Sequence, residues 1–265
     1  MIKRLNDITE CLEWMNDLIC DESFSTPFCD RERILSISGK DNSLLLGAYE
    51  AERLTGVFCL MVLDAEKYIE TVFLYTREKQ AYEDLLAYLS IEYHGYEMWF
   101  VFNPRNPVLS AYLSQKEAFF YEEQRYMEYK GTGEENIGEI ILYDDFYTDE
   151  YISIHSEEGY WDGEKVLEKK DDFYVFLCIR DNKLVGYIDL SKGENTNEIM
   201  DIRVLPEYQN CGIGALLLKK AIYANKENCL VLTVDMDNAP ANHLYEKLGF
   251  EEIPMNNIIT AKLDL

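Results

Sequence analysis

An internal repeat constrains this chain more than any other feature, because the same pattern of apolar and polar segments occurs twice at an offset of about 130 residues. In the second half, Phe173–Ile179 and Leu184–Ile188 are apolar segments separated by a short polar turn, which predicts a β-hairpin. The first half has the same arrangement at Leu44–Leu46 and Leu54–Phe58. An offset this long exceeds the period of solenoid repeats and is typical of a duplicated domain.

The two halves continue to match beyond the hairpin. Tyr68–Leu74 corresponds to Glu198–Val204, and each segment precedes a predicted helix. Farther along, the apolar segments Met98–Phe102 and Leu230–Val234 are each followed by an Asn and a Pro that mark the start of another helix. Each half is therefore expected to fold as a mixed α/β (α+β) layer, in which a central mixed β-sheet is flanked by helices.

The repeat predicts two domains joined by a short linker. Residues 131–138 contain three glycines and few core residues, as is typical of a linker. The expected organisation is a first domain at residues 1–130 and a second domain at residues 139–265. At the end of the second domain, Phe250–Pro254 and Ile258–Leu263 are expected to pair with each other as a closing hairpin.

The chain is strongly acidic, with 25 Lys and Arg against 50 Asp and Glu and a formal net charge of −25. A surface of this sign repels the phosphates of nucleic acids, so a nucleic-acid partner is not expected. The charge favours solubility, and it also raises the hypothesis that a cationic acceptor is attracted to the protein.

Other residue types limit the location and the cofactors of the protein. The seven cysteines include no Cys-x-x-Cys pair, and we expect reduced thiols in a cytoplasm. Only three histidines are present, which argues against a His-rich metal site. We also expect no export and no membrane span, because the sequence has neither a secretory signal core nor a long apolar run. The sequence does not indicate the oligomeric state.

The segment Ile202–Leu218 combines the end of a strand, a glycine-containing loop and the start of a helix. Pro206 ends the strand because it cannot donate to a sheet ladder. Gly212 and Gly214 stand where the helix begins, and glycines there let the backbone approach a ligand closely. The exposed amides and the helix dipole then favour an anion such as a pyrophosphate. The loop matches neither a Walker loop nor the Rossmann fingerprint.

These residues resemble the acyl-CoA motif of the GNAT superfamily of acyl-CoA N-acyltransferases, as Val204-x-Pro206 followed by Gln209-x-x-Gly212-x-Gly214. A second segment that resembles a motif of the family is Asn238–Phe250. The resemblance covers about residues 139–265 and extends to the first half only through the repeat. It implies two GNAT-like domains with splayed sheets, acetyl-CoA as co-substrate, and acetyl transfer to an amine of a small molecule or a peptide.

The resemblance also implies a role for each matching residue. Backbone groups of Ile202, Arg203 and Val204 would hold the pantetheine arm. Asn238 would steady the cofactor, and Tyr245 would protonate the departing CoA thiolate. The amides that would cradle the pyrophosphate belong to Gln209, Asn210, Cys211, Gly212, Ile213, Gly214 and Ala215. The family often has basic or small residues where this loop has Asn and Cys, so the loop relies on its amides and on the helix dipole.

The strand Glu198–Val204 contains the candidates for a general base. Its apolar residues change parity between positions 199 and 202, which predicts a β-bulge near residues 200–201. Glu198 and Asp201 are the candidate bases, each acting through water, although either could be an ordinary solvated acid. His243 is interpreted as a surface residue of a helix.

The first half lacks the residues of this site. At an offset of 130 residues Tyr82 and Asp84 replace Gly212 and Gly214, and at the offset of 131 that fits the later segments Ser114 stands opposite the Tyr245 position. The first domain is therefore expected to be a degenerate GNAT-like domain, retained to pack against the active domain or to shape its acceptor cleft. The main alternative function is a non-catalytic acyl-CoA sensor or scaffold that has kept the binding loop.

Overall fold

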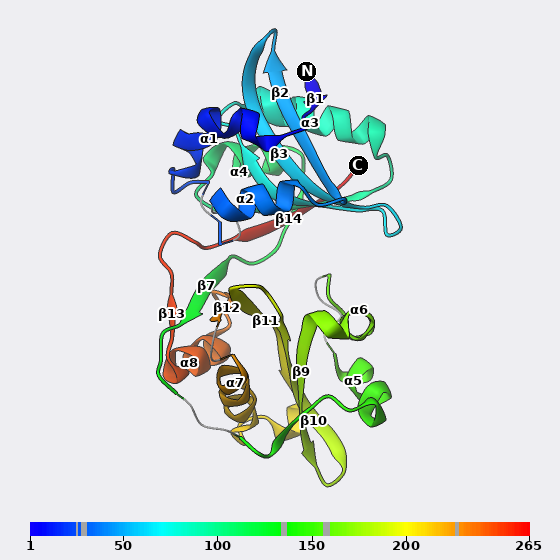
Figure 1. Ribbon diagram of the computed structural model, residues 1–265, viewed down its shortest axis with the longest axis vertical. Helices are drawn as coiled ribbons and strands as arrows, with labels where there is room; N and C mark the ends of the chain where they lie inside the picture. Colours follow the sequence, from blue (N-terminus) through cyan, green and yellow to red (C-terminus); the bar gives the residue numbers. More distant parts are fainter. Residues whose placement is uncertain (25, 28–30, 134–136, 156–159, 226–227) are drawn as a thin grey trace. The chain divides into compact units, whose positions relative to one another are not determined.

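The computed structural model describes residues 1–24, 26–27, 31–133, 137–155, 160–225 and 228–265. The chain forms two compact units, a first unit of Met1–Arg125 with Pro254–Leu265 and a second unit of Tyr126–Ile253. Each unit contains a mixed seven-stranded sheet with helices packed on it, which confirms the predicted fold class (Figure 1). Residues 134–136 of the predicted linker lie outside the described residues.

The first sheet has the strand order β1-β2-β3-β4-β5-β14-β6. Its strands are β1 (Ile2–Arg4), β2 (Ser43–Glu50), β3 (Arg53–Leu63), β4 (Tyr68–Tyr75), β5 (Glu97–Phe102), β6 (Phe119–Phe120) and β14 (Ile259–Asp264). The helices of this unit are η1 (Ile8–Cys11), α1 (Leu12–Ile19), α2 (Arg31–Ser38), α3 (Lys79–Glu92) and α4 (Pro107–Gln115).

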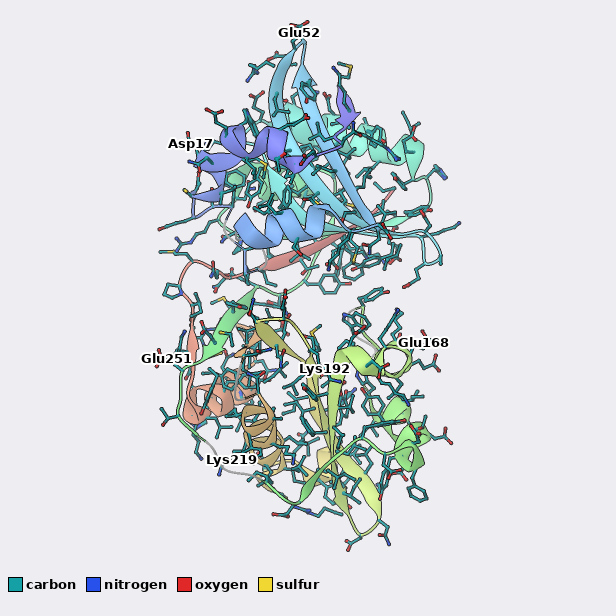
Figure 2. All side chains as sticks on the ribbon, viewed as in Figure 1. Asp17, Glu52, Glu168, Lys192, Lys219 and Glu251 are labelled. Carbon is teal, nitrogen blue, oxygen red and sulfur yellow. The ribbon has the colours of Figure 1, made fainter. Side chains whose placement is uncertain are left out.

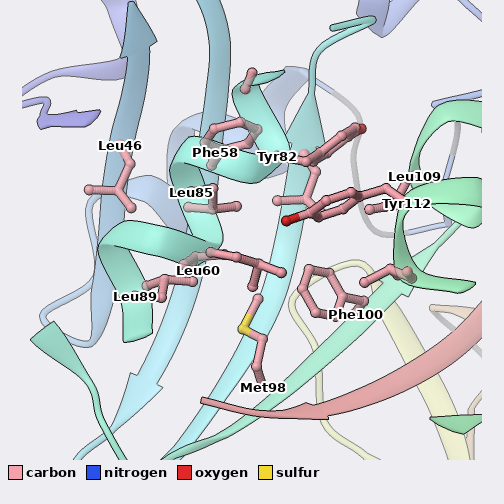
Figure 3. Close-up of a cluster of buried hydrophobic side chains, with 14 of the residues drawn as sticks. Leu46, Phe58, Leu60, Tyr82, Leu85, Leu89, Met98, Phe100, Leu109 and Tyr112 are labelled. Atoms are coloured by element: carbon pink, nitrogen blue, oxygen red, sulfur yellow. The ribbon is translucent and has the colours of Figure 1, made fainter. Parts of the chain in front are cut away.

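Alternation of side chains along these strands divides the first unit into two cores, because successive residues of a strand point to opposite faces. On one face, Leu85 of α3 and Leu109 of α4 pack against Phe58 and other strand residues (Figure 3). On the other face, Met15 of α1 and Ile34 of α2 are fully buried against the sheet. Both faces of the first sheet are therefore covered by helices.

The second sheet has the order β13-β7-β12-β11-β10-β9-β8. Its strands are β7 (Gln124–Tyr129), β8 (Ile140–Leu142), β9 (Phe173–Arg180), β10 (Lys183–Ser191), β11 (Thr196–Val204), β12 (Cys229–Asp235) and β13 (Phe250–Glu252). The helices are η2 (Asp145–Tyr147), α5 (Thr148–Ile154), α6 (Gly163–Glu168), η3 (Lys170–Asp172), η4 (Pro206–Tyr208), α7 (Ile213–Ala224) and α8 (Ala239–Leu248).

The two sheets exchange equivalent strands. In the first sheet, the C-terminal strand β14 lies between β5 and β6, and in the second sheet β7 lies between β12 and β13. Figure 1 shows β14, in red, in the first unit and β7, in green, in the second. The predicted closing hairpin of Phe250–Pro254 and Ile258–Leu263 is therefore wrong, since β13 pairs with β7 and β14 pairs with β5 and β6. The apolar pattern predicted both strands, but a pattern does not say which strand pairs with which.

The exchange also changes where the second unit ends. The compact unit stops at Ile253, whereas the repeat placed the end of the second domain at residue 265. In the first unit, the side-chain amide of Asn103 donates to the carbonyl of Met255 at 2.7 Å and holds the chain leading into β14. Acidic side chains such as Asp17 and Glu52 lie at the periphery of their unit, as the high negative charge requires (Figure 2).

Candidate functional site

The central feature of the second unit is a splay between the parallel strands β11 and β12. Their pairing runs from Thr196 opposite Cys229 to Ile199 opposite Leu232 and stops there. On the other edge of β11, the register with β10 shifts at Met200, which is the predicted β-bulge. A bulge bends its strand and increases the local twist. The second half of β11 therefore turns away from β12 and leaves an open edge.

Backbone groups on this open edge belong to Ile202 and Val204. The amide of Leu205 donates to the carbonyl of Val185 in β10 at 2.9 Å. Because successive residues of a strand direct their N–H and C=O groups to opposite edges, Ile202 and Val204 direct theirs away from β10. Gln209 already donates its side-chain amide to the Val204 carbonyl at 3.0 Å. By the same alternation, the predicted contact residue Arg203 directs its backbone toward β10.

The loop of residues 205–212 leads from this edge to the N-terminus of α7. Gly212 is the N-cap of α7 with φ = 82°, and a Cβ there would meet no heavy atom within 4 Å. Asn210 also has a positive φ of 59°. The first amide of the helix to find an intrahelical acceptor is that of Leu216, which donates to the Gly212 carbonyl at 3.1 Å. The preceding amides and the positive end of the helix dipole are thus available to an anion.

Gly214 has a different reason to be a glycine. A Cβ at this position would lie 3.2 Å from Cδ2 of Leu244 in α8, so the missing side chain allows α7 and α8 to pack closely. Gly212 therefore serves the backbone conformation of the loop, and Gly214 serves the packing of α7 on α8. Cys211 is exposed in the loop, and the nearby cation Lys183 faces Glu207 at 3.4 Å.

Tyr245 of α8 combines a buried ring with a protonated hydroxyl. Its ring packs edge-on against Phe250 at a centroid distance of 5.8 Å. Burial raises the pKa of Tyr245 strongly, and the negative charge of Asp201 raises it further. Asn238 caps α8, with its side-chain oxygen accepting from the amide of Ala241 at 3.2 Å. This cap fixes the start of the helix that carries Tyr245.

The two candidate bases lie on different parts of β11. Glu198 is in the paired part, opposite Val231, and its amide donates to the Ser191 hydroxyl at 3.1 Å. Asp201 lies beyond the bulge, with 26% of its side chain exposed, and accepts a hydrogen bond from the Tyr187 hydroxyl. Its charge also acts on Tyr245, so the two groups lie within electrostatic reach. Of the two candidate bases, Asp201 is therefore the one whose charge acts on Tyr245.

A buried polar cluster, which the sequence did not reveal, lies behind Asp201. Asp189 in β10 is fully buried and accepts from the Tyr151 hydroxyl at 2.7 Å. The Nε2 atom of His155 is 2.8 Å from the same carboxylate oxygen, and its Nδ1 is 4.0 Å from Asp201. Burial raises the pKa of Asp189 from its ordinary 3.8 to about 6. The one signal in the sequence was an Asp inside the otherwise apolar strand β10.

Comparisons with known proteins agree with this geometry. Residues 140–250 match the acetyltransferase (GNAT) family. The chain is 38% identical over 94 residues to the ribosomal protein bS18-alanine N-acetyltransferase of Haemophilus influenzae, which covers 34% of this chain and 59% of that protein. It is 32% identical over 119 residues to a mycothiol acetyltransferase of Tsukamurella paurometabola, covering 37% and 40% respectively. The chain thus matches less than two thirds of the length of either relative.

The solved structure of a tandem GNAT protein from the clavulanic acid biosynthesis pathway has the same fold, with a TM-score of 0.63 and 14% identity over 100% of this chain and 98% of that chain. The chain therefore contains a GNAT-family domain at residues 140–250. Its two units correspond to two GNAT-like domains.

The first GNAT-like unit has the splay but not the site. Parallel pairing between β4 and β5 stops at Glu70 opposite Trp99. Beyond it, the Thr71 hydroxyl accepts from the Val101 amide at 2.8 Å and donates to the Val101 carbonyl at 3.1 Å. Thr71 occupies the position of Asp201 at the offset of the repeat. The cavity at this splay, partly lined by Phe24, holds only about 20 Å³.

The phosphate loop is also missing from the first unit. Residues 76–78 connect β4 with α3, whereas residues 205–212 connect β11 with α7. The short connection uses its own polar groups, since the Thr76 hydroxyl accepts from the Glu78 amide at 3.0 Å. Tyr82 and Asp84, which the constant offset matched with the two glycines, lie inside α3. The first unit therefore has a shorter connection here, and Tyr82 and Asp84 are not the structural counterparts of the two glycines.

Among the residues that the structure describes, no group of three or more His, Cys, Asp or Glu side chains is placed to hold a metal ion. None of the described helices is both long enough and apolar enough to cross a membrane.

Proposed function

We propose that the second unit transfers an acetyl group from acetyl-CoA directly to an amine of a small molecule or a peptide. The observation that carries this proposal is the open edge of β11, which runs from Asp201 through Val204 to the N-terminus of α7. One end of this edge has an acid–base pair, and the other has unpaired helix amides.

The residues at this edge fit acetyl-CoA. The amides of Ile213, Gly214 and Ala215 would bind the pyrophosphate, and the open space at Gly212 lets that group approach the backbone. The outward backbone groups of Ile202 and Val204 would pair with the amides of the pantetheine arm. The co-substrate supplies the thioester carbonyl that the amine attacks.

The chemistry then needs one group that removes a proton and one that supplies a proton. Asp201 is the proposed base, directly or through water, and Glu198 is the second candidate. Tyr245 is the proposed acid, because its raised pKa keeps the hydroxyl protonated until the CoA thiolate leaves. The amine nitrogen loses a proton and forms the amide bond as the carbon–sulfur bond breaks, and the thiolate takes the Tyr245 proton.

The charge of the chain and the names of the relatives support the proposed class of acceptor. Matched relatives include acetyltransferases named for a ribosomal protein alanine, for mycothiol and for streptothricin. The net charge of −25 favours an acceptor that arrives as a cation. We also propose a cytoplasmic location, where acetyl-CoA is made and where free cysteines remain reduced.

Titration calorimetry with acetyl-CoA tests the proposal, followed by release of free thiol in the presence of a panel of amines. We expect one molecule bound per chain, no binding to Gly212→Glu, and thiol release only with an amine present. Binding of two molecules would contradict the assignment of a single site. Binding without transfer to any amine would favour the non-catalytic sensor, and no binding would refute both functions.

A further inference from the structure

The imidazole of His155 lies between two carboxylates of different character. Its Nε2 is 2.8 Å from Asp189 Oδ2, and its Nδ1 is 4.0 Å from Asp201 Oδ2. The Asp189 side chain is 0% exposed, whereas that of Asp201 is 26% exposed at the open edge of β11. The ring therefore lies between a fully buried acid and a partly exposed acid, which is the proposed base.

The surroundings hold this ring in place. The Tyr187 ring stacks on the imidazole at a centroid distance of 4.9 Å and an interplanar angle of 15°, while its hydroxyl donates to Asp201. The Tyr151 ring packs edge-on against the imidazole at 5.2 Å. Gly163, the first residue of α6, lies so close that a Cβ there would be 3.0 Å from the His155 Cβ. A ring packed on several sides keeps one orientation, which a proton-transfer group needs.

Two carboxylates on either side of one imidazole favour the binding of one additional proton by the ring. The side chains that titrate or carry charge and that face His155, among the described residues, are Tyr151 of α5, Tyr187 and Asp189 of β10, and Asp201 of β11. Asp189 Oδ2 accepts from Tyr151 and needs a donor from the ring, which places a proton on Nε2. The Nδ1 atom then faces the Asp201 carboxylate, and a proton there would form an ion pair with it.

We propose that His155 is a positioning residue that relays the proton taken up by Asp201, an inference that rests on the proposed function. An acceptor ammonium gives a proton to Asp201 Oδ2 and keeps the electron pair of the broken N–H bond. Rotation of the Asp201 side chain closes the 4.0 Å between Oδ2 and His155 Nδ1, and the proton passes to Nδ1, so that the ring becomes an imidazolium between two carboxylates. After the transfer the proton returns to water through Asp201, whose side chain is 26% exposed. Asp189 balances the added charge through Nε2–H.

This relay defines the class of acceptor that needs it. An alkyl amine is an ammonium at neutral pH and must lose a proton before it can attack. An aromatic amine is already neutral and does not need this first step. The cluster therefore favours acceptors with a basic aliphatic amino group, which agrees with the strong negative charge of the chain.

Nuclear magnetic resonance of ¹⁵N-histidine-labelled protein tests the coupling without any need for activity. The chain has three histidines, so the His155 signals are identified by their loss in His155→Gln. We expect the titration midpoint of His155 to fall by about one pH unit or more in Asp201→Asn, because a nearby negative charge favours the imidazolium. The exposed His94 of the first unit is the internal control. An equal midpoint in both proteins overturns the proposal.

Steady-state kinetics then separates a relay from a merely structural residue. With phenethylamine as the alkyl probe, His155→Gln should lower kcat about a hundredfold and leave the KM for acetyl-CoA unchanged. With 4-methoxyaniline as the neutral probe, the same variant should lose less than threefold. Equal losses with both amines refute the relay, and Tyr187→Phe, which keeps the stacked ring, repeats the comparison if His155→Gln unfolds. If no amine is acetylated by the wild type, the proposed function fails while the coupling is still decided by the titration.

Discussion

Asp189 and Asp201 are direct partners across the β10–β11 ladder, so that two carboxylates share one face of the sheet. Like charges opposite each other in a sheet repel, and the repulsion grows when one of them is buried. Here donors contact one oxygen of each carboxylate, since Tyr151 and His155 contact Asp189 Oδ2 while Tyr187 donates to Asp201 Oδ2. The two strands therefore bring two carboxylates together at the splay. As a result, the stability of the unit depends on the protonation of these acids.

We expect Asp189→Asn to change the pH dependence of stability. The folded pKa of Asp189 is about 6, above its ordinary 3.8, so the folded state prefers the protonated acid. This stabilisation is present in full below about pH 4 and is lost as the pH rises through 6. Its size is about 3 kcal/mol, because the pKa is raised by about two pH units. Relative to the wild type, the variant should gain about that much between pH 4 and pH 7.

Urea unfolding at a series of pH values measures this difference, with the exposed Asp149→Asn as the control for loss of one carboxylate. A constant difference between wild type and Asp189→Asn over this range would contradict the assignment of Asp189 as the titrating group.

Much of the fold could be predicted from the sequence, because the alternation of apolar and polar residues along a strand, and any break in it, can be seen from neighbouring positions. The change of parity around residues 199–202 predicted the bulge at Met200, and the glycine loop was placed correctly at the start of α7. Strand exchange could not be predicted in this way, since β13 and β14 are adjacent in the chain but pair with different sheets. Pairing depends on contacts that are distant in the sequence.

The site was predicted only in part for a similar reason. The motif residues are contiguous in the chain, and the resemblance identified them as one group. His155 and Asp189 belong to no motif and meet only because α5 packs on the face of the sheet that carries Asp189. The fixed offset of the repeat also misaligned the residues between β4 and α3. The connection in the first unit is shorter, and a constant offset does not allow for a difference in loop length.

We expect Gly212→Ala to weaken acetyl-CoA binding, and Gly95→Ala provides a closely matched control. Both glycines have φ = 82°, and a Cβ added at either would meet no heavy atom within 4 Å, but Gly95 lies in the first unit. Each substitution should cost about 1 kcal/mol of stability, because L-residues disfavour a positive φ. Only Gly212→Ala should raise the Kd for acetyl-CoA, by about tenfold, as measured by calorimetry. Equal affinity in the two variants would argue against the loop as the pyrophosphate site.

We expect Tyr245→Phe to slow acetyl transfer without loss of cofactor binding. Phenylalanine keeps the buried ring and its contact with Phe250, so only the proton donor is removed. The value of kcat should fall about a hundredfold, and the Kd for acetyl-CoA should stay within about twofold. Tyr112→Phe removes the hydroxyl of a buried tyrosine in α4 of the first unit and should leave both constants unchanged. An unchanged kcat in Tyr245→Phe would show that another group protonates the thiolate.

We expect Thr71→Val to loosen the closed splay of the first unit. Valine has nearly the same shape as threonine, but it cannot bond to the amide and the carbonyl of Val101, which the Thr71 hydroxyl now joins. Leaving these groups unpaired should cost about 1–3 kcal/mol. Amide hydrogen exchange in β5, followed by mass spectrometry, should therefore become faster in this variant. Thr55→Val, which changes another buried threonine of the same sheet, is the control. If β5 exchanges equally slowly in both variants, packing rather than the hydroxyl bridge holds the splay closed.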